Sequence, residues 1–386
     1  MSLQITENPT TAFTDSKPHY VQLDALRGVA ALLVVWYHVF EGFQFASGAD
    51  KIEAINHGYL AVDFFFVLSG FVISYAYDSR WGKALTTPNF FKRRLVRLHP
   101  MVIMGAVIGV CTFLMQGSVQ WDGTHIATSS IMLALLCMMF FVPAVPGCRY
   151  EIRGNGEMFP LNGPAWSLFF EYLGNIIYAL FIRRLSTRNL KILTVLLALM
   201  HIIFSAGNLS GYGMIGVGWT LDATNFFGGL LRMLCPFTIG MLVSRTFHKV
   251  KVKNSFIACS ILLIFLFHTP YINDMGGICM NGVFESFCVV IVFPIIVLLG
   301  ATSDENNSMI LKICRFLGNI SFPLYITHYP VMYLFYSWLI DKKLYTLGET
   351  WPRVTCTYLL CIAIAYLCYR FYDVPLRKWL AKKLKM

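Results

Sequence analysis

Two ionisable side chains lie eleven residues apart within one apolar segment of the chain. They are Arg27 and His38 in LDALRGVAALLVVWYHVF, residues 23–40. Eleven residues make close to three turns of α-helix, so both side chains share one face, about 16 Å apart along the axis. A histidine can take a proton from a hydroxyl, or it can carry an acyl group covalently. Alternatively, Arg27 reaches the lipid headgroups, His38 bonds a neighbouring helix, and both residues are structural.

Polar residues in other apolar segments favour a chemical role. Measured from the predicted ends of their segments, Glu171, Asp63, His38 and Arg232 fall at similar depth, in the outer half of the membrane. Four such groups in four segments fit one water-filled cavity better than lipid. We therefore expect a catalytic group of His38, Glu171 and Asp63, in which a carboxylate orients the imidazole and stabilises its charged form. Further residues expected to line this cavity are Ser69, Trp166, Arg232 and His328.

A second candidate site lies in FFKRRLVRLHP, residues 90–100. Arg94 and Arg97 are three residues apart and share a helical face. Guanidinium groups bind phosphate in a bidentate manner, so this face suits a phosphorylated donor. The same cluster is also typical of the basic loops that anchor a membrane protein at its cytoplasmic side.

The composition indicates a polytopic membrane protein. The 386 residues are 57% hydrophobic and 13% charged, which is about half the charged share of a soluble domain. The net charge of +11 could suggest nucleic acid as a partner. The basic residues, however, cluster between apolar segments, as in cytoplasmic loops, which argues against nucleic-acid binding. None of the eleven cysteines forms a CxxC pair, and we predict no metal site.

The distribution of Lys and Arg predicts how the chain crosses the membrane. Segment 130–146 is short and is closed by Pro143 and Pro146. If it does not cross and the N-terminus is cytoplasmic, the cytoplasmic segments hold 22 basic residues and the outer segments 6. We therefore predict an all-α polytopic membrane protein with about ten transmembrane helices and both termini cytoplasmic, in which 130–146 is re-entrant or lies on the surface. The predicted spans are 22–43, 58–77, 100–118, 165–183, 190–206, 226–246, 254–269, 281–300, 318–340 and 354–373.

One integral-membrane domain is expected to fill residues 21–376. Residues 1–20 are polar and lack the features of a cleaved signal peptide, so we predict a short cytoplasmic segment there and a first span that stays as an anchor. Residues 377–386 are predicted to be a basic cytoplasmic tail. No internal repeat is seen in the pattern of segments.

Six stretches resemble the integral-membrane acyltransferase-3 family and lie in that family's usual order. The resemblance covers residues 21–380 and implies a ten-span domain in which Arg27 and His38 are paired functional residues. It also implies that Arg94 and Arg97 form the arginine pair at the cytoplasmic face. Relatives usually have Glu-Glu where this chain has Phe170-Glu171. The six stretches are LDALRGVAALLVVWYH, AVDFFFVLSGFVI, RRLVRLHP, PAWSLFFEY, ISFPLYITHYP and YDVPLRKWL.

The resemblance implies an O-acyltransferase that moves an acetyl or other short acyl group from cytoplasmic acyl-CoA to a hydroxyl of an extracytoplasmic or envelope glycan. Acetyl-CoA would be the donor substrate, bound by Arg27, Arg94 and Arg97, and no bound cofactor is expected. His38 would act as a general base or as a covalent acyl carrier. The expected partners are acyl-CoA, a glycan or other hydroxyl acceptor and the lipid membrane, and the expected location is the inner (plasma) membrane of a bacterium. A stand-alone domain is expected, without the soluble esterase-like domain that some relatives carry.

A secondary transporter or flippase is the alternative function, with Arg, Glu and His forming a proton relay through the membrane. Inverted repeats would support that alternative.

The predicted topology can be tested by cysteine labelling from outside the cell in a Cys-depleted background. The bias in basic residues requires residues 147–164 to be extracytoplasmic and 184–190 cytoplasmic. We expect a cysteine at Gly156 to react with an impermeant maleimide and one at Ser186 to stay unlabelled. The reverse pattern would overturn the count of ten spans.

Overall fold

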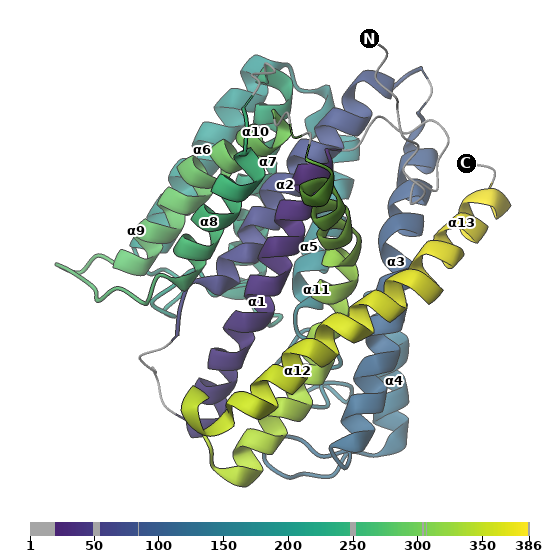
Figure 1. The fold of residues 1–386 in the computed structure, drawn as a ribbon, viewed down its shortest axis with the longest axis vertical. Coiled ribbons are helices and arrows are strands. Elements are labelled where there is room, and N and C mark those ends of the chain that lie inside the picture. The colour runs from purple at the N-terminus through teal and green to yellow at the C-terminus, as the bar shows by residue number, and fades with distance from the viewer. Residues whose placement is uncertain are drawn as a thin grey trace.

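The computed structural model describes residues 20–48, 55–83, 85–247, 252–302, 305 and 307–384, and these fold into a bundle of helices without a named strand (Figure 1). Nine helical stretches among them are long and apolar enough to cross a membrane, so the chain is a multi-pass all-α membrane protein, as predicted. The helices are α1 Val21–Ser47, α2 Ala61–Tyr77, α3 Thr87–Met115, α4 Thr128–Met139, α5 Ala165–Leu180, α6 Thr187–Ala206, α7 Ala223–Thr246, α8 Ser255–His268, α9 Met280–Phe287, α10 Phe293–Ala301, α11 Ser308–Lys342, α12 Leu347–Leu367 and α13 Val374–Lys383.

Two closely packed helix pairs, α1 with α11 and α2 with α7, form the centre of the bundle. Glycines allow their backbones to touch. A Cβ at Gly28 would lie 2.4 Å from the carbonyl oxygen of Leu317, and one at Gly70 only 1.9 Å from that of Phe237. Small residues are typical of helix contacts in membranes, because close approach gives the van der Waals packing that holds such helices together. We call the end of the bundle where α1 begins and α13 ends the terminal face, and the opposite end the distal face (Figure 1).

The predicted span at 254–269 corresponds to α8, which at 14 residues is short for a membrane crossing. Before it, α7 ends at the terminal face, where Arg245 pairs with Asp78 just beyond α2. After it, α9 begins toward the distal face (Figure 1). Helix α8 packs on α1 and α10 at the place of the predicted tenth span, although it is shorter than the nine stretches that are long enough to cross a membrane.

Helix α4 covers most of segment 130–146 and does not cross the bundle. Just beyond its end, Phe141 packs on the rings of His99 and Tyr172, with centroid separations of 6.2 and 5.0 Å. His99 precedes the distal end of α3 by 16 residues, or about 24 Å. The chain then returns to the distal loop, where the N–H of Trp121 donates to the carbonyl of Arg153. Of the two predicted possibilities, the segment is therefore the re-entrant one.

A second inserted segment, 151–164, has irregular backbone and packs inside the bundle. The side-chain amide of Asn162 donates to the carbonyl of Ile326 over 2.7 Å. On α3, a Cβ at Gly109 would lie 2.2 Å from the carbonyl oxygen of Leu161, so the segment lies directly on the helix backbone. Irregular backbone at this depth needs such protein partners, because lipid offers none.

Because of this inserted segment, α5 begins inside the bundle and not at the distal face. Asn162 lies against Gly105, which precedes the distal end of α3 by 10 residues, or about 15 Å. The helix then reaches the terminal face, where Tyr178 donates to Asp78. Glu171 consequently lies deeper from the distal face than the sequence predicted.

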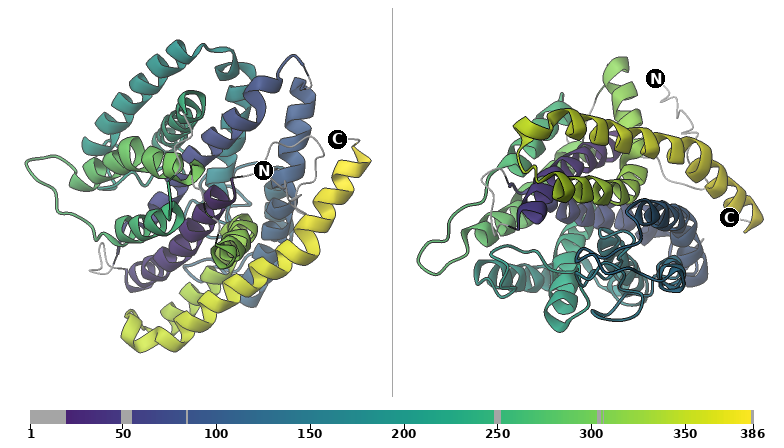
Figure 2. Two further views of the ribbon diagram at one scale, coloured as in Figure 1. Left: turned by 45° about the horizontal axis from the view of Figure 1, so that its top comes forward. Right: turned by 90° about the horizontal axis from the view of Figure 1, so that it is seen from below.

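The chain ends in a long helical strap. Figure 2 shows α12 and α13 running obliquely along one side of the bundle. They are joined by a π-helical turn, Cys368–Asp373. The predicted basic tail at 377–386 is thus helical through Lys383. The predicted segment at 1–20 lies outside the described residues, apart from Tyr20.

The glycine contacts give a stability prediction. Gly70→Ala and Gly240→Ala each place a Cβ 1.9 Å from a carbonyl oxygen of the facing helix. The backbones must separate, and overpacking of this kind typically costs ~1–3 kcal/mol or more. We expect a lower Tm of the detergent-purified protein for both variants. Gly348→Ala is the matched control, because a Cβ there meets nothing within 4 Å. An unchanged Tm in the first two variants would contradict the close packing of α2 on α7.

Candidate active site

A cavity of about 180 Å³ lies in the terminal half of the bundle, between α1, α2, α3, α5, α11 and the turn before α13. The residues predicted to bind a donor, Arg27, Arg94 and Arg97, all line it. So do Ser69 and Glu171, which the sequence had placed with His38. Further charged residues that line the cavity are Asp24, Arg315, Asp373 and Arg377.

Glu171 neutralises one of the cavity arginines. A terminal N–H of Arg94 donates to Glu171 over 2.6 Å, and the hydroxyl of Ser69 donates to the same oxygen over 2.9 Å. Arg94 is buried, so its charge requires a partner close by. Glu171 lies deep enough to be this partner because α5 begins inside the bundle, away from the distal face.

The other two predicted arginines differ in how they are held. Arg27 donates to the hydroxyl of Ser321 on α11 over 2.9 Å and lies 3.2 Å from Asp24 one turn away. Arg97 has neither a hydrogen-bond nor an ion-pair partner among the described residues. Its guanidinium is therefore available to an anion that enters the cavity.

The strap adds a further pair that sequence reasoning missed. Arg377 lies 2.7 Å from Asp373, four residues earlier. The i, i+4 spacing of opposite charges was the signal available in the sequence. The pair joins the cavity wall because the π-helical turn carries Asp373 inward against the residues of α3.

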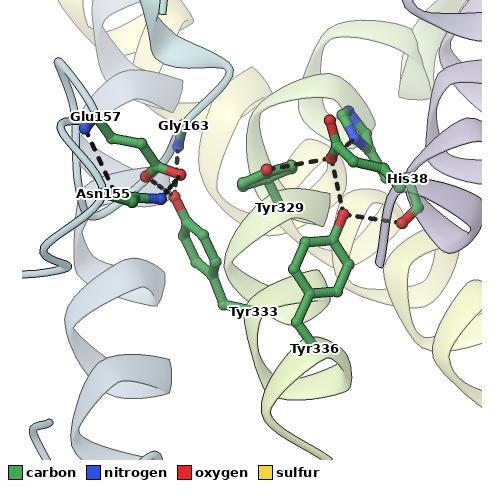
Figure 3. Close-up of polar contacts among 8 residues, drawn as sticks. His38, Asn155, Glu157, Gly163, Tyr329, Tyr333 and Tyr336 are labelled. Carbon is green, nitrogen blue, oxygen red and sulfur yellow. Dashed lines mark hydrogen bonds and ion pairs between the residues drawn. The ribbon is translucent and has the colours of Figure 1, made fainter. Parts of the chain in front are cut away.

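His38 lies nearer the distal face and has a carboxylate partner that the sequence analysis did not consider. Its Nδ1–H donates to Oε2 of Glu41 over 2.6 Å. The same oxygen accepts hydroxyls from Tyr336 at 2.9 Å and Tyr329 at 3.2 Å (Figure 3). A proton on Nδ1 leaves the lone pair of His38 on Nε2, which is the arrangement of an oriented general base. The expectation that Glu171 or Asp63 orients the imidazole is therefore wrong, and the i, i+3 spacing to Glu41 was the signal available.

A second histidine stacks on the first. The rings of His38 and His328 are 5.2 Å apart and inclined by 26°. His328 is fully buried on α11, one turn beyond Tyr325, whose ring lines the arginine cavity. His328 does not line the arginine cavity, and its stacking places it beside His38, the residue whose cavity it was expected to line.

The tyrosines of α11 connect this pair to the inserted segment 151–164. The hydroxyl of Tyr333 donates to Glu157 and accepts the N–H of Gly163 at 3.1 Å (Figure 3). The guanidinium of Arg153 stacks on the same ring, 3.5 Å from its centroid. Burial raises the pKa of Glu157 to about 7. These contacts fix the inserted segment on the helix that carries His328.

Asp63, Arg232 and Trp166 form a third, separate group. Two nitrogens of Arg232 donate to the two carboxylate oxygens of Asp63 over 3.0 and 2.8 Å, and Asp63 is fully buried. The guanidinium also lies 5.1 Å from the centre of the Trp166 ring. The expectation that Asp63, Arg232 and Trp166 share one cavity with His38 and Glu171 is wrong. Their depths in the membrane were counted from the predicted ends of the segments, and this count fails when helices begin at different levels.

Comparison with known proteins now decides the family. A family model described as an acyltransferase domain matches residues 20–370, nearly the whole chain. The chain belongs to the acyltransferase-3 family.

Several relatives of this acyltransferase-3 protein can be aligned with it. Protein 2 in the picA locus of Rhizobium radiobacter is 36% identical over 167 residues, which is 42% of this chain and 81% of that protein. A peptidoglycan O-acetyltransferase of Listeria monocytogenes is 24% identical over 94% of the chain, and an O-acetyltransferase of Staphylococcus aureus is 25% identical over 94%. The chain spans 56% and 58% of those two relatives, or little more than half their length. No solved structure matches the chain.

The buried pair in this acyltransferase-3 protein predicts a stability effect. Asp63→Leu leaves the guanidinium of Arg232 without its counter-ion, which typically costs ~3–5 kcal/mol. We expect a much lower Tm for this variant in detergent. The double variant Asp63→Leu, Arg232→Met should recover most of the loss, since no charge then remains unpaired. If Asp63→Leu kept the Tm of the unmodified protein and lost only activity, Asp63 would be the catalytic residue that the sequence suggested.

Proposed function

We propose that the protein is a membrane O-acyltransferase that takes an acetyl or other short acyl group from acyl-CoA at the terminal face and passes it to a hydroxyl of a glycan at the distal face. The terminal face is the cytoplasmic side in this proposal, in keeping with the bias in basic residues. The observation that carries the proposal is the placement of two different sites along α1 and α11. An arginine cavity lies toward the terminal end, and an oriented histidine lies toward the distal end.

The arginine cavity suits the donor because acyl-CoA carries several phosphate groups. Guanidinium groups bind phosphate through paired hydrogen bonds, and such charge-assisted bonds are about twice as strong as neutral ones. Arg97 is free to make them. Arg94 is paired with Glu171, so an incoming phosphate would share Arg94 with that carboxylate or displace it. In this proposal the carboxylate of Glu171 neutralises Arg94 until a phosphate of the donor takes over that role.

The His38–Glu41 pair suits the acceptor. The lone pair on Nε2 can remove a proton from a sugar hydroxyl, and the carboxylate stabilises the imidazolium that forms. Aromatic rings surround Glu41, whose side chain is 31% exposed. Phe45 is 5.0 Å from Trp121 and 5.9 Å from Tyr336, ring centre to ring centre. A partly exposed carboxylate near several aromatic rings is a suitable surface for a sugar ring and its hydroxyls.

The relatives support the same chemistry. The proteins of Listeria monocytogenes and Staphylococcus aureus are named O-acetyltransferases, and the first is named for peptidoglycan. An envelope glycan is therefore the proposed acceptor class, and the inner (plasma) membrane of a bacterium the proposed location.

The donor half of the proposal is tested by the binding of radiolabelled acetyl-CoA to purified protein. Arg97→Ala is the cleanest variant, because Arg97 has no hydrogen-bond or ion-pair partner to lose in the part of the chain that the structure describes. We expect acetyl-CoA binding to weaken about 10- to 100-fold, since one charge-assisted hydrogen bond contributes ~1.5–3 kcal/mol. Arg97→Lys should recover part of the affinity, because lysine keeps the charge but lacks the planar fork. Lys92→Ala, an exposed change on the same helix, is the matched control. Unchanged affinity for acetyl-CoA in Arg97→Ala would mean that Arg97 does not bind the donor and serves only to orient the chain in the membrane.

The acceptor half is tested on the same preparations by following the label into envelope glycan. His38→Gln keeps a hydrogen bond but cannot take up a proton. We expect it to bind acetyl-CoA normally and to lose transfer by about 100-fold or more, the usual contribution of a general base. Substantial transfer by His38→Gln would mean that His38 only supports the structure.

A further inference from the structure

His328 carries a buried nitrogen lone pair that no protein group uses. Its Nδ1 lies 3.0 Å from the carbonyl oxygen of Leu324. Because a carbonyl only accepts hydrogen bonds, Nδ1 carries the proton and Nε2 carries the lone pair. Nε2 is buried and has no hydrogen-bond partner among the described residues. A neutral imidazole in this state is a nucleophile. A buried acceptor without a hydrogen bond also lowers the stability of the fold, so its presence calls for an explanation.

The position of His328 sets it apart from other buried histidines. His57 and His201 also have an Nε2 without a partner. His57, however, is held by the carbonyl of Thr269, and His201 contacts Ser286 on α9. Only His328 among these three both stacks on His38 and adjoins a ring that lines the arginine cavity, with its own ring 5.9 Å from that of Tyr325.

The two proposed sites contact α11 at different levels. Ser321, the partner of Arg27, precedes His328 by seven residues of α11, which is about 10 Å of helix. The hydroxyl of Tyr336, which bonds Glu41, lies on the same helix a further eight residues toward the distal face. Along α11, His328 therefore lies between the donor cavity and the contact with Glu41. An acyl group that moves from donor to acceptor has to pass this level of the helix.

We propose that His328 is the acyl carrier of the reaction and that His38 is its base. This inference rests on the proposed function. Nε2 of His328 attacks the thioester carbonyl carbon, the C–N bond forms, the C–S bond breaks, and CoA leaves as a thiolate. The acceptor hydroxyl then attacks the acyl carbon while Nε2 of His38 takes its proton. The C–O bond forms, the C–N bond breaks, and the electron pair returns to His328. His38 releases the proton to solvent, and the thiolate takes one up, so that the products are the ester and CoA thiol.

Isotope exchange between acetyl-CoA and labelled free CoA tests this assignment without any acceptor. The exchange requires a covalent acyl-enzyme, because the acyl group must stay on the protein while one CoA leaves and another enters. We expect the unmodified protein and His38→Gln to catalyse the exchange. His328→Gln should lose it by about 100-fold or more while still binding acetyl-CoA. His201→Gln is the matched control, an equally buried histidine with the same unpartnered nitrogen, and should exchange normally.

A second measurement does not depend on how well a variant folds. Rapid quenching of the unmodified protein with acetyl-CoA, followed by peptide mass spectrometry, should locate an acetyl group on the peptide that contains His328. Exchange retained in His328→Gln, or an acetyl group found at another residue, would overturn the assignment. So would transfer to glycan by a protein that shows no exchange, since the acyl group would then pass directly. A protein that binds no acetyl-CoA at all would instead refute the proposed function.

Discussion

The packing of α1 against α11 is the contact on which the rest of the molecule depends. Near the terminal face the two backbones meet at Gly28, and Arg27 donates to Ser321. Further along, His38 stacks on His328, and the hydroxyl of Tyr336 donates to the carbonyl of His38. One helix interface therefore carries a series of polar contacts from the arginine cavity to the oriented histidine. Because each residue of a helix adds about 1.5 Å along its axis, the depth of each group is set relative to the next.

Charges inside the bundle are compatible with the membrane only because most of them have partners. Asp63 and Arg232 satisfy each other and need no solvent, so they act as a structural tie between α2 and α7. Arg94 is paired too, but its partner Glu171 faces a cavity in which Arg97 has no ion-pair partner among the described residues. That difference separates a structural ion pair from a binding site. The excess of positive charge in the cavity is the physical basis for proposing an anionic donor there.

Irregular backbone inside the bundle shapes the path between the two sites. Segment 151–164 is held by α3 and α11, and it ends at Pro164, whose carbonyl accepts the hydroxyl of Ser167. Ser167 in turn contacts the hydroxyl of Tyr325 at 2.7 Å, and both residues line the arginine cavity. The inserted segment is thus linked through Ser167 to the part of the cavity wall that adjoins His328. A membrane protein can maintain such backbone only where its polar groups find protein partners, and residues 151–153 and 157–162 of the segment are buried.

The sequence by itself determined where the helices are, that 130–146 does not cross, and that Arg94 and Arg97 share a face. The helices and the shared arginine face follow from local rules of apolar length and helical periodicity, and the path of 130–146 follows from the distribution of Lys and Arg along the chain. It also placed Arg27 and His38 on one face of α1 at different depths. Only the tertiary structure decided which polar groups meet. Counting from the ends of the segments placed Glu171 beside His38. Because of the inserted segment, however, α5 begins about 15 Å inside the distal end of α3, and Glu171 therefore lies against Arg94. Glu41 reaches His38 locally, whereas the stacking of His328 depends on the register of α11 against α1. Register between helices is set by the packing of many small residues at once, and no single segment of the sequence contains it.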